Sequence, residues 1–347
     1  MVLFRCVSVD TLQPSRRISM GGFFYANQDA ETVLQRRSRI VQILNVPQRV
    51  RFRSSLAAAL LDGHFEHPAK YFSLAQYILA SVPPSLRLIT LLTDFGDRDW
   101  FVAAMKGAIL SIHPQARIID LSHQIAPHRI DEASYFLKSC YREFPEGTIH
   151  VVVVDPGVGS ERRAIIVKSA RYFFLAPDNG VLTYIFDDEQ PVEVREIDQR
   201  KFRRESPGHT FDGRDLLAPV AARLAKDEPF ELYGPVIGDY RTFAIAQPRW
   251  EQTILVGEIV YVDRFGNLIS NLTQQHLEEA RSVAMGRQLS VRIGARIIEG
   301  VVNSYSEGMA EKPFALINSN GKLEVFLKEA SAAELFQVGR GERIEIS

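Results

Sequence analysis

HVVVVDPGVGSERR, residues 150–163, is the most informative segment of this chain. Its four consecutive valines predict a short, buried strand, because β-branched residues favour strands and the run is too short for a helix. The strand ends at Asp155, which Pro156 and Gly157 follow, so a carboxylate lies at its carboxyl end. Ligands of open α/β sheets bind at that end. Gly157 and Gly159 let the backbone turn sharply and approach a ligand closely.

Two arginines, Arg162 and Arg163, lie on the same loop as Asp155. A carboxylate and a guanidinium on one loop could hold and polarise a small molecule. The same residues could equally form a structural turn followed by a pair of surface arginines, since loop carboxylates are common. This segment alone leaves both interpretations open.

Composition is that of a globular protein, and 347 residues suffice for two ordinary domains with an extension. The formal net charge of −1 gives no overall attraction to nucleic acid or to a membrane surface. No apolar run approaches the roughly 18 to 20 residues that span a bilayer, and no secretory signal is evident. The two cysteines, Cys6 and Cys140, have neither metal-binding nor disulfide spacing, so a cytoplasmic, reducing location fits best.

Residues 1–85 differ from the rest, because they are rich in arginine and poor in acids. Helices are plausible over Thr32–Leu44, Ser54–Leu61 and Ser73–Ser81, but no cluster of chemically active residues appears. The composition could suggest an organelle transit peptide. A poorly ordered extension, or translated sequence upstream of the true start, is the favoured interpretation.

Residues 86–248 alternate between strand and helix patterns, which predicts an α/β domain with a mostly parallel sheet covered on both faces. The expected strands are RLITLLT from Arg87, Arg117–Leu121, the valine run, Ala164–Lys168 and Tyr172–Leu175. The expected helices are Trp100–Ser111, Arg129–Phe144, Val181–Phe186 and Gly213–Leu224.

Residues 249–347 consist of short alternating segments punctuated by glycine, which predict a small β-barrel or sandwich. The expected strands are Gly257–Val262, Gln288–Ile293, Arg296–Val301, Phe314–Ile317, Leu323–Phe326 and Arg343–Ile346. One helix is expected over Thr273–Val283.

Four segments place an acidic residue close to a glycine at the end of an element: TDFG with Asp94, DPGVG with Asp155, PDNG with Asp178 and TFDGRD with Asp212. If the strands are parallel, these loops gather at one edge of the sheet and line one crevice. The crevice lacks histidine and cysteine clusters, which argues against a transition metal and leaves magnesium open. Aspartates can bind vicinal hydroxyls, so a ligand that carries ribose is a reasonable hypothesis.

Several common sites are missing from the sequence. There is no GxxxxGK[ST] phosphate loop and no GxGxxG at the start of a helix after the first strand, so neither a nucleoside triphosphate nor a dinucleotide is indicated. No GxSxG elbow nominates a serine nucleophile.

Six motifs together resemble one family. TDFG-x-x-D, SHQIAPHRIDEAS, VVVVDPGVGSERR, PDNGVLT, TFDGRDLLAPVAA and YVDRFGNLISNL occur in the order seen in the S-adenosylmethionine (SAM) hydroxide adenosyltransferases, or SAM hydrolases. This family is related to the SAM-dependent fluorinase and chlorinase. The resemblance covers roughly residues 86–347 and leaves the amino-terminal segment unexplained.

The resemblance implies a homotrimer in which SAM lies between the α/β domain of one subunit and the β-barrel of its neighbour. Water would attack the ribose C5′ and release methionine and adenosine, with no cofactor or metal. Asp155 matches the catalytic aspartate that positions and deprotonates the water. Arg162 matches the family's arginine, whose charge should keep Asp155 ionised.

The resemblance also implies the substrate contacts. Asp94 matches the position that holds the ribose hydroxyls, Asp263 the methionine amino group, and Asn267 the adenine. Tyr305 is placed to stack on the purine, with packing in the core as an equal alternative. Ser319 matches a contact to the methionine carboxylate. In the same region, Lys328 departs from the asparagine that is usual in the family.

Asp212 is the more important departure, because the family carries a histidine there, in TFHGRD. Asp212 could still accept a hydrogen bond from water, but it would add a second negative charge near Asp155 and raise the pKa of one of the two. His209 lies three residues upstream and would need a shift of the loop to substitute.

Two alternatives to hydrolysis remain. In a halogenase the attacking anion would be repelled by Asp155, which the related halogenases lack. A protein that binds SAM or adenosine without turning it over, such as a sensor, is favoured only by Asp212.

Overall fold

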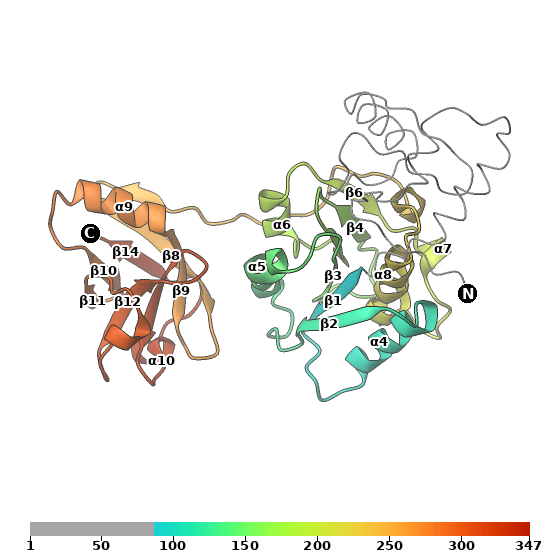
Figure 1. Cartoon of the computed structure of the whole chain (residues 1–347), viewed down its shortest axis with the longest axis horizontal. Helices are drawn as coiled ribbons and strands as arrows, with labels where there is room; N and C mark the ends of the chain where they lie inside the picture. The colour runs from blue at the N-terminus through green and yellow to red at the C-terminus, as the bar shows by residue number, and fades with distance from the viewer. Residues whose placement is uncertain (1–86) are drawn as a thin grey trace, which may run out of the picture. The chain divides into compact units, whose positions relative to one another are not determined.

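The computed structural model describes residues 87–347 (Figure 1). The predicted extension over residues 1–85 and its three expected helices lie outside the described residues. Within them, the chain forms one six-stranded and one eight-stranded sheet. The predicted fold class, an α/β sheet followed by a small barrel, is confirmed. The division of the chain at residue 248 stays a prediction.

The first sheet has the strand order β2-β1-β3-β5-β4-β6. Its strands are β1 (Leu88–Thr93), β2 (Arg117–Ser122), β3 (Ile149–Val153), β4 (Ala164–Lys168), β5 (Phe173–Pro177) and β6 (Glu193–Glu196). Strands β2, β1, β3 and β5 are parallel, whereas β4 is antiparallel to both of its neighbours. Strand β6 was not predicted from the sequence, because EVRE is short and mostly charged.

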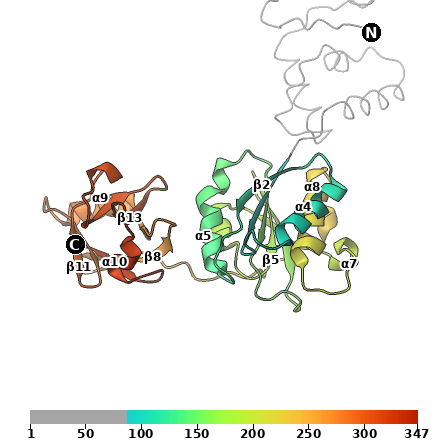
Figure 2. The same cartoon turned by 90° about the horizontal axis from the view of Figure 1, so that it is seen from below.

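The valine run is buried on both faces of the sheet. Val151 and Val153 pack in one core with helices α4 (Phe101–Ile112) and α8 (Ala218–Ala225). Val152 and Val154 pack in the opposite core with residues of α5 (Ile130–Cys140) and α6 (Thr183–Asp188). Figure 2 shows α5 on one side of the sheet and α4 with α8 on the other. The two faces are therefore covered as predicted.

Two predicted helices differ from the structure in detail. The helix expected over Arg129–Phe144 stops at Cys140 and continues as the 3₁₀ turn Tyr141–Glu143. The helix expected from Gly213 begins as a π-helical turn, Gly213–Leu217, which leads into α8. A Cβ at Gly213 would lie 3.0 Å from Met105 Sδ and 3.4 Å from Val153 Cγ1, so glycine lets this turn lie close to β3. The short helix α7 (Gln199–Phe202) was not predicted.

The second sheet is antiparallel and resembles a nearly closed barrel, with the order β11-β10-β14-β8-β9-β13-β12 and with β7 paired to β8. Its strands are β7 (Arg249–Glu251), β8 (Ile254–Val262), β9 (Leu268–Thr273), β10 (Ser290–Ile293), β11 (Arg296–Glu299), β12 (Pro313–Ile317), β13 (Lys322–Leu327) and β14 (Arg343–Ile346). The expected helix is α9 (Gln274–Val283), which Thr273 and His276 cap reciprocally. Strands β7 and β9 and the helix α10 (Ala332–Phe336) were missed.

Among the described residues, no helix is both long enough and apolar enough to cross a membrane.

Leu91 and Leu110 give a matched test of the core. Leu91 is fully buried in β1, whereas Leu110 on α4 is 42% exposed. Leu91→Ala should lower the free energy of unfolding by about 2–5 kcal/mol, because it removes buried methyl groups and leaves a cavity. Leu110→Ala should change it by less than about 1 kcal/mol. Urea unfolding of both variants measures the difference, and equal losses would contradict the placement of Leu91 in the core.

Candidate functional site

Three aspartates follow parallel strands that end at the same edge of the first sheet. Thr93 at the end of β1 is paired with Val153 at the end of β3, and Val151 is paired with Leu175 of β5. Asp94, Asp155 and Asp178 lie just beyond these ends. The predicted gathering of carboxylates at one edge is therefore confirmed.

The two arginines reach the same edge because β4 runs in the opposite direction. Ala164, the first residue of β4, is paired with Pro177, the last residue of β5. Arg162 and Arg163 directly precede Ala164, so the reversal of β4 places both of them beside the aspartates.

Arg162 lies between two carboxylates. Its Nη2 is 2.5 Å from Asp155 Oδ2 and 2.7 Å from Asp212 Oδ2. Its Nη1 donates to the carbonyl oxygen of Arg163 at 2.8 Å, and its Nε is buried without a hydrogen-bond partner. The side chains of Asp155, Arg162 and Asp212 are each only 5–6% exposed. The structure thus brings the three predicted catalytic residues together in a cluster that solvent hardly screens.

Burial is the largest influence on Asp155, and it raises the pKa of that carboxyl. The charge of Arg162 acts in the opposite direction, while Asp212 raises the pKa further. The expected repulsion between the two aspartates is therefore present. The charge of Arg162 favours the ionised form of Asp155, as expected, but desolvation outweighs it and the net pKa is raised.

Asp212 has a second partner that sequence reasoning missed. Arg203 Nη1 lies 2.7 Å from Asp212 Oδ1. His209 does not take the place of Asp212: its side chain is exposed, and its carbonyl oxygen lies 3.2 Å from where a Cβ on Gly159 would stand. No motif marks Arg203, because its role appears only when α7 packs beside the π-helical turn.

Arg163 has a different role from Arg162. Its guanidinium binds the buried Asp178 at 2.7 Å and the exposed Asp239 at 2.7 Å, and the other oxygen of Asp178 accepts the peptide N–H of Arg241. These contacts tie the loop to residues 239–241. Of the two interpretations of the arginine pair, the structural one therefore describes Arg163, whereas Arg162 faces the carboxylates.

An aromatic cluster, which the sequence analysis did not single out, lies beside the carboxylates. Phe211 directly precedes Asp212, and its ring packs edge-on against Phe95, Trp100 and Phe101 with centroids 5.3–5.7 Å apart. Trp100 remains 58% exposed. The cluster gives the site an apolar wall, against which the ring of a ligand could lie.

Asp94 is half-buried at the end of β1, and its Oδ2 accepts a hydrogen bond from the peptide N–H of His128 at 2.9 Å. His128 has a positive φ of 68°, a conformation that is uncommon outside glycine. The peptide group of His128 therefore holds Asp94 at the sheet edge.

Asp263 and Asn267 form the turn between β8 and β9. Asp263 Oδ1 accepts the peptide N–H groups of Phe265 and Asn267, and Oδ2 accepts Asn267 Nδ2, all at 2.9 Å. Asp263 Oδ2 has a second lone pair that could accept a hydrogen bond from another donor, such as an ammonium group. Both residues thus have a structural role in the turn, beside any contact with a ligand.

Tyr305 is not a core residue, because it is 50% exposed. Its hydroxyl donates to the buried Glu324 at 2.5 Å, and its ring meets Phe326 edge-on at 4.9 Å. Asn318 Nδ2 also donates to Glu324, at 3.0 Å. Tyr305 is therefore held in place with part of its ring free, which fits stacking better than core packing.

Ser319 lies exposed in the turn between β12 and β13. Thr273 at the end of β9 is paired with Lys322, whereas Leu268 at its start is paired with Val325. Ser319 and Asn267 therefore lie at opposite ends of the β9–β13 pair. Lys328 is exposed just after β13.

Within residues 87–347, no hydrogen bond or ion pair joins the sheet-edge residues, Asp94, Asp155, Arg162 and Asp212, to the barrel residues, Asp263, Asn267, Tyr305 and Ser319. The predicted site residues therefore form two separate groups within one chain. We call them the sheet-edge group and the barrel group.

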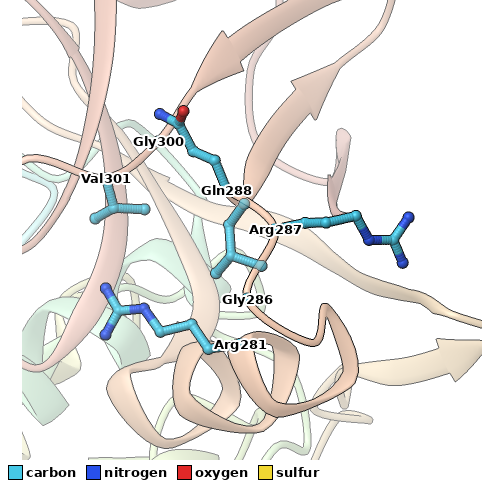
Figure 3. A pocket seen from close by; sticks show the side chains of 7 residues that line it. Arg281, Gly286, Arg287, Gln288, Gly300 and Val301 are labelled. Carbon is cyan, nitrogen blue, oxygen red and sulfur yellow. The ribbon is translucent and has the colours of Figure 1, made fainter.

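A pocket on the barrel contains none of these residues. Arg281, Gly286, Arg287, Gln288, Leu289, Gly300 and Val301 line it. Figure 3 shows the guanidinium groups of Arg281 and Arg287 pointing to opposite sides, so they do not converge on one ligand. In the part of the chain that the structure describes, no group of three or more histidine, cysteine or acidic residues is placed to hold a metal ion.

Family models match both halves of the described chain. The model of the SAM hydroxide adenosyltransferase N-terminal domain matches residues 89–234, and that of the C-terminal domain matches residues 257–345.

Individual proteins match over the same part of the chain. The (R)-S-adenosyl-L-methionine hydrolase of Methanocaldococcus jannaschii is 33% identical, with 75% of this chain and 96% of that protein covered. The protein of the same name from Salinispora tropica is 31% identical, with 75% and 97% covered. A fluorinase of an Actinoplanes species is 26% identical, with 75% and 97% covered.

Among solved structures, an uncharacterized conserved protein from Thermotoga maritima has a TM-score of 0.69 and 33% identity, with 75% of this chain and 99% of that chain covered. A conserved hypothetical protein from Thermus thermophilus has a TM-score of 0.61 and 30% identity, with 75% and 100% covered.

Proposed function

The chain belongs to the SAM hydroxide adenosyltransferase family, and we propose that it hydrolyses S-adenosyl-L-methionine to adenosine and L-methionine. The observation that carries this proposal is the buried contact between Asp155 and Arg162 at the carboxyl edge of the parallel strands. It supports the proposal because a carboxylate and a fixed cation lie at the edge where ligands of such sheets bind.

The reaction needs a base more than an acid. The water oxygen forms a bond to the ribose C5′ while the bond between C5′ and sulfur breaks, and the electron pair of that bond stays on sulfur. Because the sulfonium departs as a neutral thioether, no proton has to be supplied to the leaving group. Water is a poor nucleophile, so it must be held in line with the departing sulfur and must lose a proton.

Asp155 accepts that proton in the proposed mechanism. Burial raises its pKa, which makes the carboxylate a stronger base than an exposed aspartate. Arg162 fixes the orientation of Asp155 and stabilises its ionised form. Activity should therefore be lost as the pH falls through the raised pKa, because a protonated Asp155 cannot accept a proton.

The cluster disfavours halide as the nucleophile. Asp155 and Asp212 are both buried, and an attacking fluoride or chloride would approach two carboxylates at once. Water carries no charge and can donate a hydrogen bond to either of them. We therefore assign the chain to hydrolysis rather than halogenation, although fluorinases are among its relatives.

Incubation of the purified protein with SAM tests the reaction. We expect adenosine and methionine in equal amounts, measured by chromatography at neutral pH with and without added chloride and fluoride. Halogenated nucleoside would show a halogenase. Tight binding of SAM without any product would support the sensor alternative and would overturn hydrolysis.

Asp155→Asn tests the base. The amide keeps the shape of the carboxylate but does not accept a proton, so kcat should fall by about 10²–10⁴-fold while the Kd for SAM stays within about threefold. Asp178→Asn is the matched control, because it changes a carboxylate at the same sheet edge that faces Arg163 instead. It should lower the melting temperature and leave kcat within about threefold. Equal losses of kcat in the two variants would contradict the assignment of Asp155.

The two groups of site residues support an assembly. Because no hydrogen bond or ion pair joins the sheet-edge group to the barrel group within residues 87–347, we propose a homotrimer with each site between subunits. Asp94 would hold the ribose and Tyr305 would stack on the purine. Asn267 would contact adenine and Asp263 the methionine amino group. Ser319 lies at the opposite end of the β9–β13 pair from both residues, so it does not fit the predicted contact to the carboxylate, which shares a carbon with that amino group. We place the trimer in the cytoplasm, where the thiol of Cys140 would stay reduced.

Mixed assemblies test the shared site. Tyr305→Ala removes a half-exposed ring and should weaken stacking on the purine, so that activity at limiting SAM falls. In an equimolar mixture of Asp155→Asn and Tyr305→Ala chains that assemble at random, about a quarter of all sites should combine an intact sheet-edge group with an intact barrel group and recover activity at limiting SAM. A particle mass other than three times the 39.2 kDa of one chain, or no recovery on mixing, would overturn the proposal.

A further inference from the structure

Arg203 completes a row of four charged side chains at the sheet edge. Its Nη1 lies 2.7 Å from Asp212 Oδ1, and the other oxygen of Asp212 lies 2.7 Å from Arg162 Nη2. Arg162 in turn contacts Asp155 at 2.5 Å. The charges therefore alternate along the row Asp155, Arg162, Asp212, Arg203, and their formal sum is zero.

The row is poorly screened by solvent. The side chains of Asp155, Arg162 and Asp212 are 5–6% exposed, and that of Arg203 is 15% exposed. Interactions between charges are much stronger in such surroundings than in water. If Arg203 were neutral, two buried carboxylates would share the single guanidinium of Arg162.

The groups around the row leave Arg203 as the second cation for Asp212. Asp155 faces Arg162 and the peptide N–H of Gly157 from its own loop, and Asp212 from the π-helical turn. On that turn, Arg214 and Asp215 pair with each other at 2.6 Å. In the described residues, the ion pairs of Asp212 are those with Arg162 and Arg203.

We propose that Arg203 is a positioning residue for the hydrolysis: by pairing with Asp212, it leaves Arg162 engaged with the base Asp155. This inference rests on the proposed function. Arg203 does not touch the water or the sugar, and it acts through Asp212 and Arg162. Its consequence is that the active form of Asp155 persists to lower pH than it would with Asp212 paired to Arg162 alone.

A purely structural role for Arg203 is the competing explanation. Its Nη2 donates to Gln199 Oε1 at 2.7 Å, so Arg203 also fastens the end of α7. Loss of that contact would lower stability at every pH. It would not change the pH at which Asp155 becomes protonated. A substitution at Asp212 would not reverse the loss of stability.

The test is the pH profile of kcat/KM for SAM, measured with the full chain. Its acidic limb is the fall in kcat/KM as the pH is lowered. Arg203→Met should move the midpoint of this limb to higher pH by about one unit, because Asp155 then lies beside an unbalanced negative charge. KM should stay within about threefold. Arg203→Lys should restore part of the shift, and Asp212→Asn added to Arg203→Met should reverse it, because it removes the charge that Arg203 balanced.

Arg204→Met is the matched control. It removes the same charge from the next residue, which is exposed, donates its peptide N–H to the carbonyl oxygen of Asp215 and acts on the Asp215 carboxylate as a nearby charge. It should leave the limb in place. The inference would be overturned if the midpoint of the acidic limb moved equally in Arg203→Met and Arg204→Met. It would also be overturned if adding Asp212→Asn to Arg203→Met did not return the midpoint to its wild-type pH.

A measurement without catalysis separates this inference from the proposed function. With Arg203→Met the folded-state pKa of Asp155 should rise further, so the loss of stability is present above that pKa and disappears as the pH falls below it. Melting temperatures of wild type and Arg203→Met should therefore converge towards acidic pH. If SAM is not hydrolysed but the curves converge, the proposed function fails while the charge balance between Arg203 and Asp212 stands. A gap that is constant with pH contradicts the role of Arg203.

Discussion

The contact of one guanidinium with two buried carboxylates is the interaction on which this site depends. Asp155 and Asp212 would repel each other without Arg162 between them. Arg162 can lie there only because β4 runs antiparallel to β5, so that the loop from the end of β3 to the start of β4 stays at the carboxyl edge of the sheet. The direction of β4 thus determines whether Arg162 can balance the charges of Asp155 and Asp212.

The surroundings of this contact affect the basicity of Asp155 and the kind of ligand that the site can hold. Burial raises the pKa of Asp155, and the aromatic rings beside Asp212 form an apolar wall. A cationic sulfonium substrate and a neutral water suit such a site, whereas a free halide does not. The aspartate at position 212, where the resemblance implies histidine, keeps the site neutral because Arg203 supplies a second positive charge.

Much of the fold could be predicted from local patterns. The valine run, the strand ends at Asp94 and Asp155, and the helix after Thr273 are encoded by residues next to each other in sequence. The strand β6 and the helix α7 escaped prediction because they are short and charged, and tertiary packing forms them. The π-helical turn after Asp212 was predicted as ordinary helix, since the pattern of apolar residues is similar in both.

The sequence by itself determined the strand–helix alternation, the acids at the strand ends and the six motifs of the family, because each of these is a property of neighbouring residues. Tertiary structure alone decided that Arg163 pairs with Asp178 and Asp239, and that Arg203 balances Asp212. The physical reason is distance along the chain: Arg162 and Asp212 are 50 residues apart, and only the packing of β4 against β5 and of the π-helical turn against β3 brings them within hydrogen-bonding range.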